Sequence, residues 1–149
     1  MNGVANGWTT GRRIAVATAI AGTLDILAAV VLTLIAHRAP AAMLRGVASG
    51  PFPAAVDWGT AGSLLGLVTH FVLMAIMASV FVLAADHWVA LKRRWIVAAL
   101  GYGIVTWVAM NLVVVPLRFG TMPSATSAVI QLFCHIVLVA LPIAAVARR

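Results

Sequence analysis

TAGSLLGLVTHFVLMAIMASVFVLAA, residues 60–85, is the stretch that decides the fold. Its only ionisable side chain is His70, and the run is longer than the roughly 20 apolar residues that cross a membrane as a helix. The whole chain has 149 residues, of which 64% are hydrophobic and only 9% are charged. Because a water-soluble domain carries about 25% charged residues, this composition predicts an integral membrane protein.

Three further apolar runs of similar length lie at residues 14–36, 95–117 and 125–147. None of the four alternates between apolar and polar residues as a barrel strand would, so we predict helices. The first run exceeds the roughly 7–15 apolar residues of a secretory signal peptide, and we expect it to be retained. The sequence therefore predicts an all-α membrane protein with one transmembrane domain, residues 1–149, arranged as a four-helix bundle.

Positive charges predict the orientation of these spans. The N-terminal tail, the second loop and the C-terminus carry Arg12, Arg13, Lys92, Arg93, Arg94, Arg148 and Arg149, whereas the first and third loops carry only Arg38, Arg45 and Arg118. By the positive-inside rule, both termini face the cytoplasm. The net charge of +7 does not indicate nucleic acid, because these residues flank apolar runs and form no basic stripe with interleaved aromatic residues. The lipid bilayer is the expected partner.

The first loop, residues 37–59, contains the segment PAAMLRGVASG. Pro40 suits the first turn of a helix and Gly50 suits its end. Met43, Leu44 and Val47 would give this helix an apolar side, so we expect a short helix on the outer face of the membrane. An ordinary surface loop is the alternative.

Each span holds one strongly polar residue away from its ends: Asp25, His70, Asn111 and His135. At 1.5 Å per residue, His70 and His135 both lie about 15 Å from the outer ends of their spans, Asp25 about 17 Å and Asn111 about 9 Å. Polar groups at such depth are costly in hydrocarbon and usually face other helices. We therefore predict an intramembrane polar layer of these four residues. Thr69, Gln131 and Cys134 lie beside them as candidate neighbours.

The polar layer leaves several functions open. A carboxylate and two imidazoles can exchange protons, which favours a transport-related or proton-responsive membrane protein. The alternative is an accessory or assembly subunit in which the layer only fixes helix register, in a homo-oligomer or a larger membrane complex. A third hypothesis is a cofactor site, with haem b held by His70 and His135 or a divalent metal held by Asp25 and both histidines.

Other chemistry is disfavoured. The chain has no Glu, no phosphate-binding loop and no Ser-His-acid set at a water-exposed face. It is therefore not expected to be a hydrolase or a phosphoryl-transfer enzyme. Cys134 is the only cysteine, so no intramolecular disulfide can form and no CxxC pair is present.

The runs GLVTHFVLMA, YGIVTWVAMNLVVVPL and CHIVLVALPIA, with AGTLDI in the first span, resemble small uncharacterised bacterial inner-membrane proteins. More distantly, the chain is similar to the YagU family, which also places Thr-His in one span and a histidine in the final one. It differs in a shorter first loop and in Asn111, where YagU-like proteins carry a histidine. The resemblance implies a multi-pass protein of the bacterial inner membrane and no particular activity.

Overall fold

The structure is a computed structural model and describes residues 7–149. Its helices are α1 (Thr10–Ile35), α2 (Pro40–Ala48), the 3₁₀ turn η1 (Pro53–Asp57), α3 (Gly59–His87), α4 (Val89–Arg93), α5 (Trp95–Trp107), the π-helical η2 (Val108–Val114), α6 (Val115–Phe119), α7 (Ala125–Phe133), the π-helical η3 (Cys134–Ala140) and α8 (Leu141–Ala147). The part of the chain thus described contains no β-strand. The all-helical prediction is confirmed.

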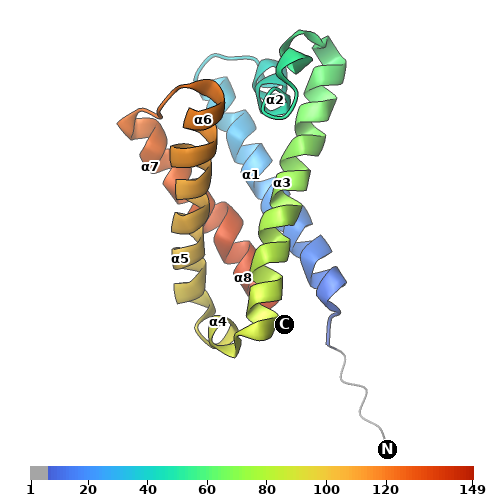
Figure 1. Ribbon diagram of the computed structural model, residues 1–149, viewed down its shortest axis with the longest axis vertical. Helices are drawn as coiled ribbons and strands as arrows, with labels where there is room; N and C mark the ends of the chain where they lie inside the picture. Colours follow the sequence, from blue (N-terminus) through green and yellow to red (C-terminus); the bar gives the residue numbers. More distant parts are fainter. Residues whose placement is uncertain (1–6) are drawn as a thin grey trace, which may run out of the picture.

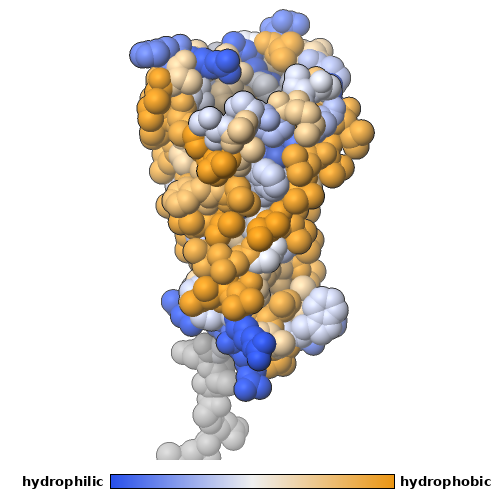
Figure 2. Space-filling view, turned by 90° about the vertical axis from the view of Figure 1, so that its left-hand side faces the viewer, coloured by the Kyte–Doolittle hydropathy of each residue, from blue (hydrophilic) through white to orange (hydrophobic). Residues whose placement is uncertain are grey.

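Four continuous helices are long and apolar enough to cross a membrane: Thr10–Ile35, Gly59–His87, Trp95–Phe119 and Ala125–Ala147. They run up and down alternately, so the beginning of α1 and the end of α8 lie at the same end of the molecule (Figure 1). We call this the basic end, after Arg13, Lys92 and Arg148, and the opposite end the α2 end. On the face shown in Figure 2, apolar side chains cover most of the surface between the two ends. The prediction of four helices long and apolar enough to cross a membrane is confirmed.

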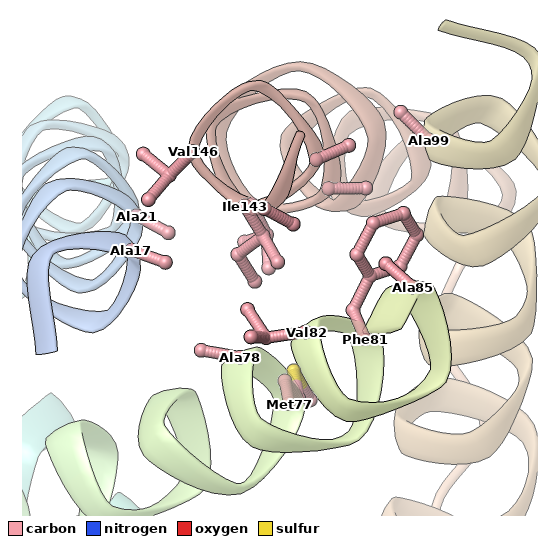
Figure 3. Packing of buried hydrophobic residues seen from close by; sticks show 14 of the residues in the cluster. Ala17, Ala21, Met77, Ala78, Phe81, Val82, Ala85, Ala99, Ile143 and Val146 are labelled. Carbon is pink, nitrogen blue, oxygen red and sulfur yellow. The ribbon is translucent and has the colours of Figure 1, made fainter. Parts of the chain in front are cut away.

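The core lies toward the basic end and consists mainly of small and aliphatic residues. Ile143, Val82 and Val139 are fully buried, and Figure 3 shows Ile143 of α8 between Ala17 and Ala21 of α1 and Val82 of α3. Small side chains let membrane helices approach closely, which increases their van der Waals contact. The fourth long helix therefore packs against both α1 and α5.

The third and fourth long helices each contain a π-helical segment of seven residues that ends two residues before a proline. Pro116 follows η2 and Pro142 follows η3. A proline inside a helix cannot donate a hydrogen bond, and its ring clashes with the carbonyl four residues earlier. A wider π turn relieves that conflict without breaking the helix. Both spans therefore remain continuous, and their polar residues Asn111 and His135 lie on the π segments.

A helix does follow Pro40, and it packs tightly against α3. Figure 1 looks nearly along the axis of α2, which crosses the long helices beside the first half of α3. Gly62 and Gly66 of α3 allow this approach, because a Cβ atom at Gly66 would overlap the backbone carbonyl of Leu44. The Ser63 hydroxyl also donates a hydrogen bond to the carbonyl oxygen of Ala41 at 3.0 Å.

Candidate functional site

Asp25 and His70 form the central pair of the candidate site. His70 of α3 is buried, and its Nδ1 lies 3.9 Å from Oδ2 of Asp25 on α1. Its other ring nitrogen, Nε2, lies 2.9 Å from the carbonyl oxygen of Gly22. Because a carbonyl oxygen can only accept a hydrogen bond, Nε2 carries a hydrogen. The nitrogen that faces the carboxylate is therefore the one that can gain or lose a proton.

Gly22 explains why α1 and α3 meet closely enough to form this pair. A Cβ atom at Gly22 would lie 2.7 Å from Cε1 of Phe71, so any larger residue would push the phenyl ring away. The Phe71 ring in turn lies edge-on to the His70 imidazole, with 5.3 Å between the ring centroids. The glycine thus exposes its own carbonyl to His70 and leaves room for the ring beside it.

His135 belongs to a separate hydrogen-bonded group, which joins the fourth long helix to α5. Its Nδ1 lies 3.3 Å from the Thr106 hydroxyl of α5, and both residues are buried. That hydroxyl lies 3.0 Å from the carbonyl of Tyr102 and 3.1 Å from that of Gly103. Its single hydrogen is donated to one of these carbonyls, so its oxygen accepts from Nδ1–H of His135. His135 is therefore held by α5 and not by Asp25.

The two histidines, although predicted at the same depth, are engaged by different helices. His70 bonds to α1 and His135 bonds to α5. The three ligands proposed for a metal, Asp25, His70 and His135, do not converge: residues 7–149 contain no group of three His, Cys, Asp or Glu side chains arranged to hold a metal ion. The layer predicted from depth thus contains one pair, Asp25–His70, whereas His135 bonds to Thr106, a residue outside that layer.

Asn111 lies apart from both of these contacts. Its amide Nδ2 donates at 3.3 Å to the carbonyl of Trp107, one turn earlier in the same helix. The contact between helices is made instead by Trp107, whose indole nitrogen donates to the carbonyl of Ala128 on α7 at 3.1 Å. Asn111 was expected from its polarity, whereas Trp107 could have been suggested only by its helical spacing to Gly103 and Asn111.

The three candidate neighbours also take different positions. Cys134 is buried beside His135 in η3. Thr69 lines an apolar pocket between α2, α3 and α6. Gln131 is half-buried on α7, and its side chain makes no hydrogen bond within residues 7–149. Depth along a span thus did not predict which way each of these side chains faces.

The basic end holds a charged cluster that sequence reasoning missed. Arg13, only 5% exposed, donates from Nη1 and Nη2 to the two carboxylate oxygens of Asp86 at 2.8 and 2.7 Å. It also donates to the carbonyl of Ala147 at 3.0 Å, and Lys92 donates to Asp86 at 2.6 Å. This cluster joins the ends of α1, α3 and α8. From the sequence, Arg13 was used only to predict the orientation of the first span. Asp86, which lies at the end of the second span close to Lys92, was a signal for an ion pair at this end.

Comparison with known proteins assigns no function to these residues. No protein-family model, curated protein or solved structure matches the chain. The function therefore has to be argued from the Asp25–His70 pair itself.

Proposed function

We propose that this chain is a small multi-pass membrane protein that takes up and releases one proton at Asp25 and His70. The observation that carries the proposal is the 3.9 Å approach of the Asp25 carboxylate to Nδ1 of His70, while Nε2 is bonded to Gly22. Carboxylates and imidazoles that face one another inside a membrane are the usual components of proton-handling sites.

The proposal follows from counting hydrogens. With Nε2–H committed to Gly22, the space between Nδ1 and Asp25 holds either one proton or none. With one proton the pair is neutral overall, as a carboxylic acid and an imidazole or as a carboxylate and an imidazolium. Without it, a bare carboxylate faces a lone pair, and the pair carries one negative charge. That charge is costly in an apolar interior, so protonation changes how strongly α1 and α3 hold together.

The more accessible partner is the acid. The Asp25 side chain is 22% exposed, against 9% for that of His70. A proton taken up by the carboxylate can pass to Nδ1, which has no competing hydrogen. His70 serves as the second acceptor, and the bond to Gly22 holds its ring in place.

Infrared spectroscopy tests this site directly, because the chain has only three acidic residues, Asp25, Asp57 and Asp86. In reconstituted protein, a pH titration is expected to show a protonated-carboxyl band that is absent from Asp25→Asn and unchanged in Asp57→Asn. His70→Gln keeps an N–H for Gly22 but removes the second proton acceptor, so it should shift the midpoint of the band. A band that persists in Asp25→Asn would contradict the proposal.

A flux measurement separates transport from proton sensing. If the pair conducts protons, proteoliposomes with wild-type protein should dissipate a pH gradient at least about a hundredfold faster than those with Asp25→Asn, the lower end of what a positioned acid–base group contributes. If wild type and Asp25→Asn show equal flux while wild type still shows the Asp25 carboxyl band, the pair senses protons but does not transport them.

We also propose the bacterial inner membrane as the location, with both termini in the cytoplasm and α2 on the outer face. The excess of Lys and Arg at the basic end supports this orientation, and the resemblance to bacterial proteins supports the location.

Cysteine labelling tests the orientation, because the single native cysteine is buried. In a Cys134→Ala background, a membrane-impermeant maleimide added to intact spheroplasts is expected to label Ala42→Cys on α2. Arg93→Cys at the basic end should react only after the membrane is permeabilised. The reverse pattern would place the termini outside.

A further inference from the structure

A pocket of about 740 Å³ is lined by residues of α2, α3 and the third long helix. Its volume falls within the roughly 300–1,000 Å³ of ligand sites in proteins. Its walls are formed by Met43 and Val47 of α2, Val72 and Leu73 of α3, and Val114 and Val115 of the third long helix. The pocket therefore lies between two neighbouring helices, α2 and α3, and a third helix that comes much later in the chain.

The lining of the pocket is almost entirely apolar. Thr69 supplies a single hydroxyl, Arg118 supplies the only charge, and the other side chains are apolar. Thr69 is next to His70 in sequence, but the imidazole is bonded toward α1 and does not line this pocket. The pocket is thus separate from the proposed proton site, and its occupant must be largely hydrocarbon.

Arg118 places an uncompensated positive charge in the pocket wall. Its Nε and Nη2 donate to the carbonyl oxygens of Gly50 and Ser49, both at 2.7 Å. Within residues 7–149, no carboxylate forms an ion pair with it, because Asp25 and Asp86 pair elsewhere and Asp57 forms none. The carbonyl groups of Gly50 and Ser49 hold the guanidinium in position without neutralising its charge. Nη1 of Arg118 makes no hydrogen bond to any of residues 7–149.

We propose that this pocket binds one anionic phospholipid, with an acyl chain between α2, α3 and α6 and the phosphate on Arg118. Charge complementarity selects the headgroup, since a guanidinium donates charge-assisted hydrogen bonds to phosphate. The apolar lining selects the tail. Burying a tail gains little relative to the surrounding lipid, so most of the selectivity comes from the attraction between Arg118 and a headgroup of net negative charge.

Native mass spectrometry from detergent tests the proposal with phosphatidylglycerol and phosphatidylcholine of identical acyl chains. Arg118 can donate to the phosphate of either lipid, but the choline cation of phosphatidylcholine cancels the phosphate charge. Wild-type protein is therefore expected to retain one phosphatidylglycerol with about fivefold higher affinity than phosphatidylcholine, the effect of one basic side chain on a net anionic headgroup. Arg118→Gln should abolish that preference. Arg38→Gln removes the same charge from the first loop, outside this pocket, and should retain it.

A second variant separates binding from the docking of α2, which also depends on Arg118. Val72→Trp fills the pocket while keeping Arg118 and should reduce retention of phosphatidylglycerol about tenfold. Val31→Trp on α1, outside the pocket, should not, although Val31 and Val72 are both 53% exposed. A phosphatidylglycerol with a photoreactive tail should crosslink to α3 or α6 near the pocket. Retention unchanged in Val72→Trp, crosslinks spread evenly over the helices, or a lipid-independent dimer that is lost in Val72→Trp would each overturn the proposal.

Discussion

Gly66→Ala is expected to force α2 away from α3 and to destabilise the protein by about 3 kcal/mol, the upper part of the usual range for overpacking. The added Cβ would overlap the backbone carbonyl of Leu44. A backbone atom cannot rotate away as a side chain can, so the whole of α2 must move. The change should be measured as the free energy of unfolding in detergent micelles, together with protease cleavage near Gly50.

Gly101→Ala is the matched control, because it adds the same atom to the interior of another long helix. Nothing lies within 4 Å of a Cβ placed at Gly101. Since alanine favours helix over glycine by up to about 1 kcal/mol, this variant should be neutral or slightly more stable. Similar stabilities for the two variants would show that α2 does not depend on the close contact at Gly66. Gly66→Ala should also weaken lipid retention, because α2 forms one wall of the pocket.

Arg13→Gln is expected to destabilise the protein by about 3 kcal/mol, because removing one partner of a buried ion pair typically costs about 3–5 kcal/mol. The Arg13 side chain is 6% exposed, and it joins α1 to both Asp86 and the end of α8. Asp86→Asn should cost a similar amount, since it leaves the buried guanidinium without a counterion. Reversible unfolding in mixed micelles gives both values.

Two comparisons make this result specific to the buried pair. Lys92 contacts the same carboxylate from a more exposed position, with a side chain 29% exposed. Lys92→Gln should therefore cost less than about 1 kcal/mol. The double variant Arg13→Gln/Asp86→Asn should be clearly less unstable than the sum of the two single changes. If Arg13→Gln costs no more than Lys92→Gln, the cluster does not hold the helix ends together.

The spans could be predicted closely because membrane insertion is decided by local composition. The predicted run 125–147 coincides with Ala125–Ala147, and the first helix starts only four residues before the predicted residue 14. The earlier start of the first helix has a local cause. Thr9 caps this helix by accepting a hydrogen bond from the backbone N–H of Arg12. Such a cap extends a helix beyond its apolar part.

The candidate site could be predicted only in part. Depth placed Asp25 and His70 in one layer, and in the structure their side chains approach to 3.9 Å. Depth did not reveal that His135 turns to Thr106 or that Asn111 bonds within its own helix. Rotation of each helix about its axis decides these contacts, and that rotation depends on the partner helix.

The sequence by itself determined that this chain forms four apolar helices and that three ionisable groups, Asp25, His70 and His135, lie deep within three of them. Length and hydropathy are enough for this, because unpaired backbone groups and charges are costly in hydrocarbon whatever surrounds them. Only the tertiary structure decided which polar groups meet, and it did so through close contacts at single positions. Gly22 lets α1 reach His70, Gly66 lets α2 lie on α3, and Arg13 joins three helix ends, because shape and distance act between residues far apart in the chain.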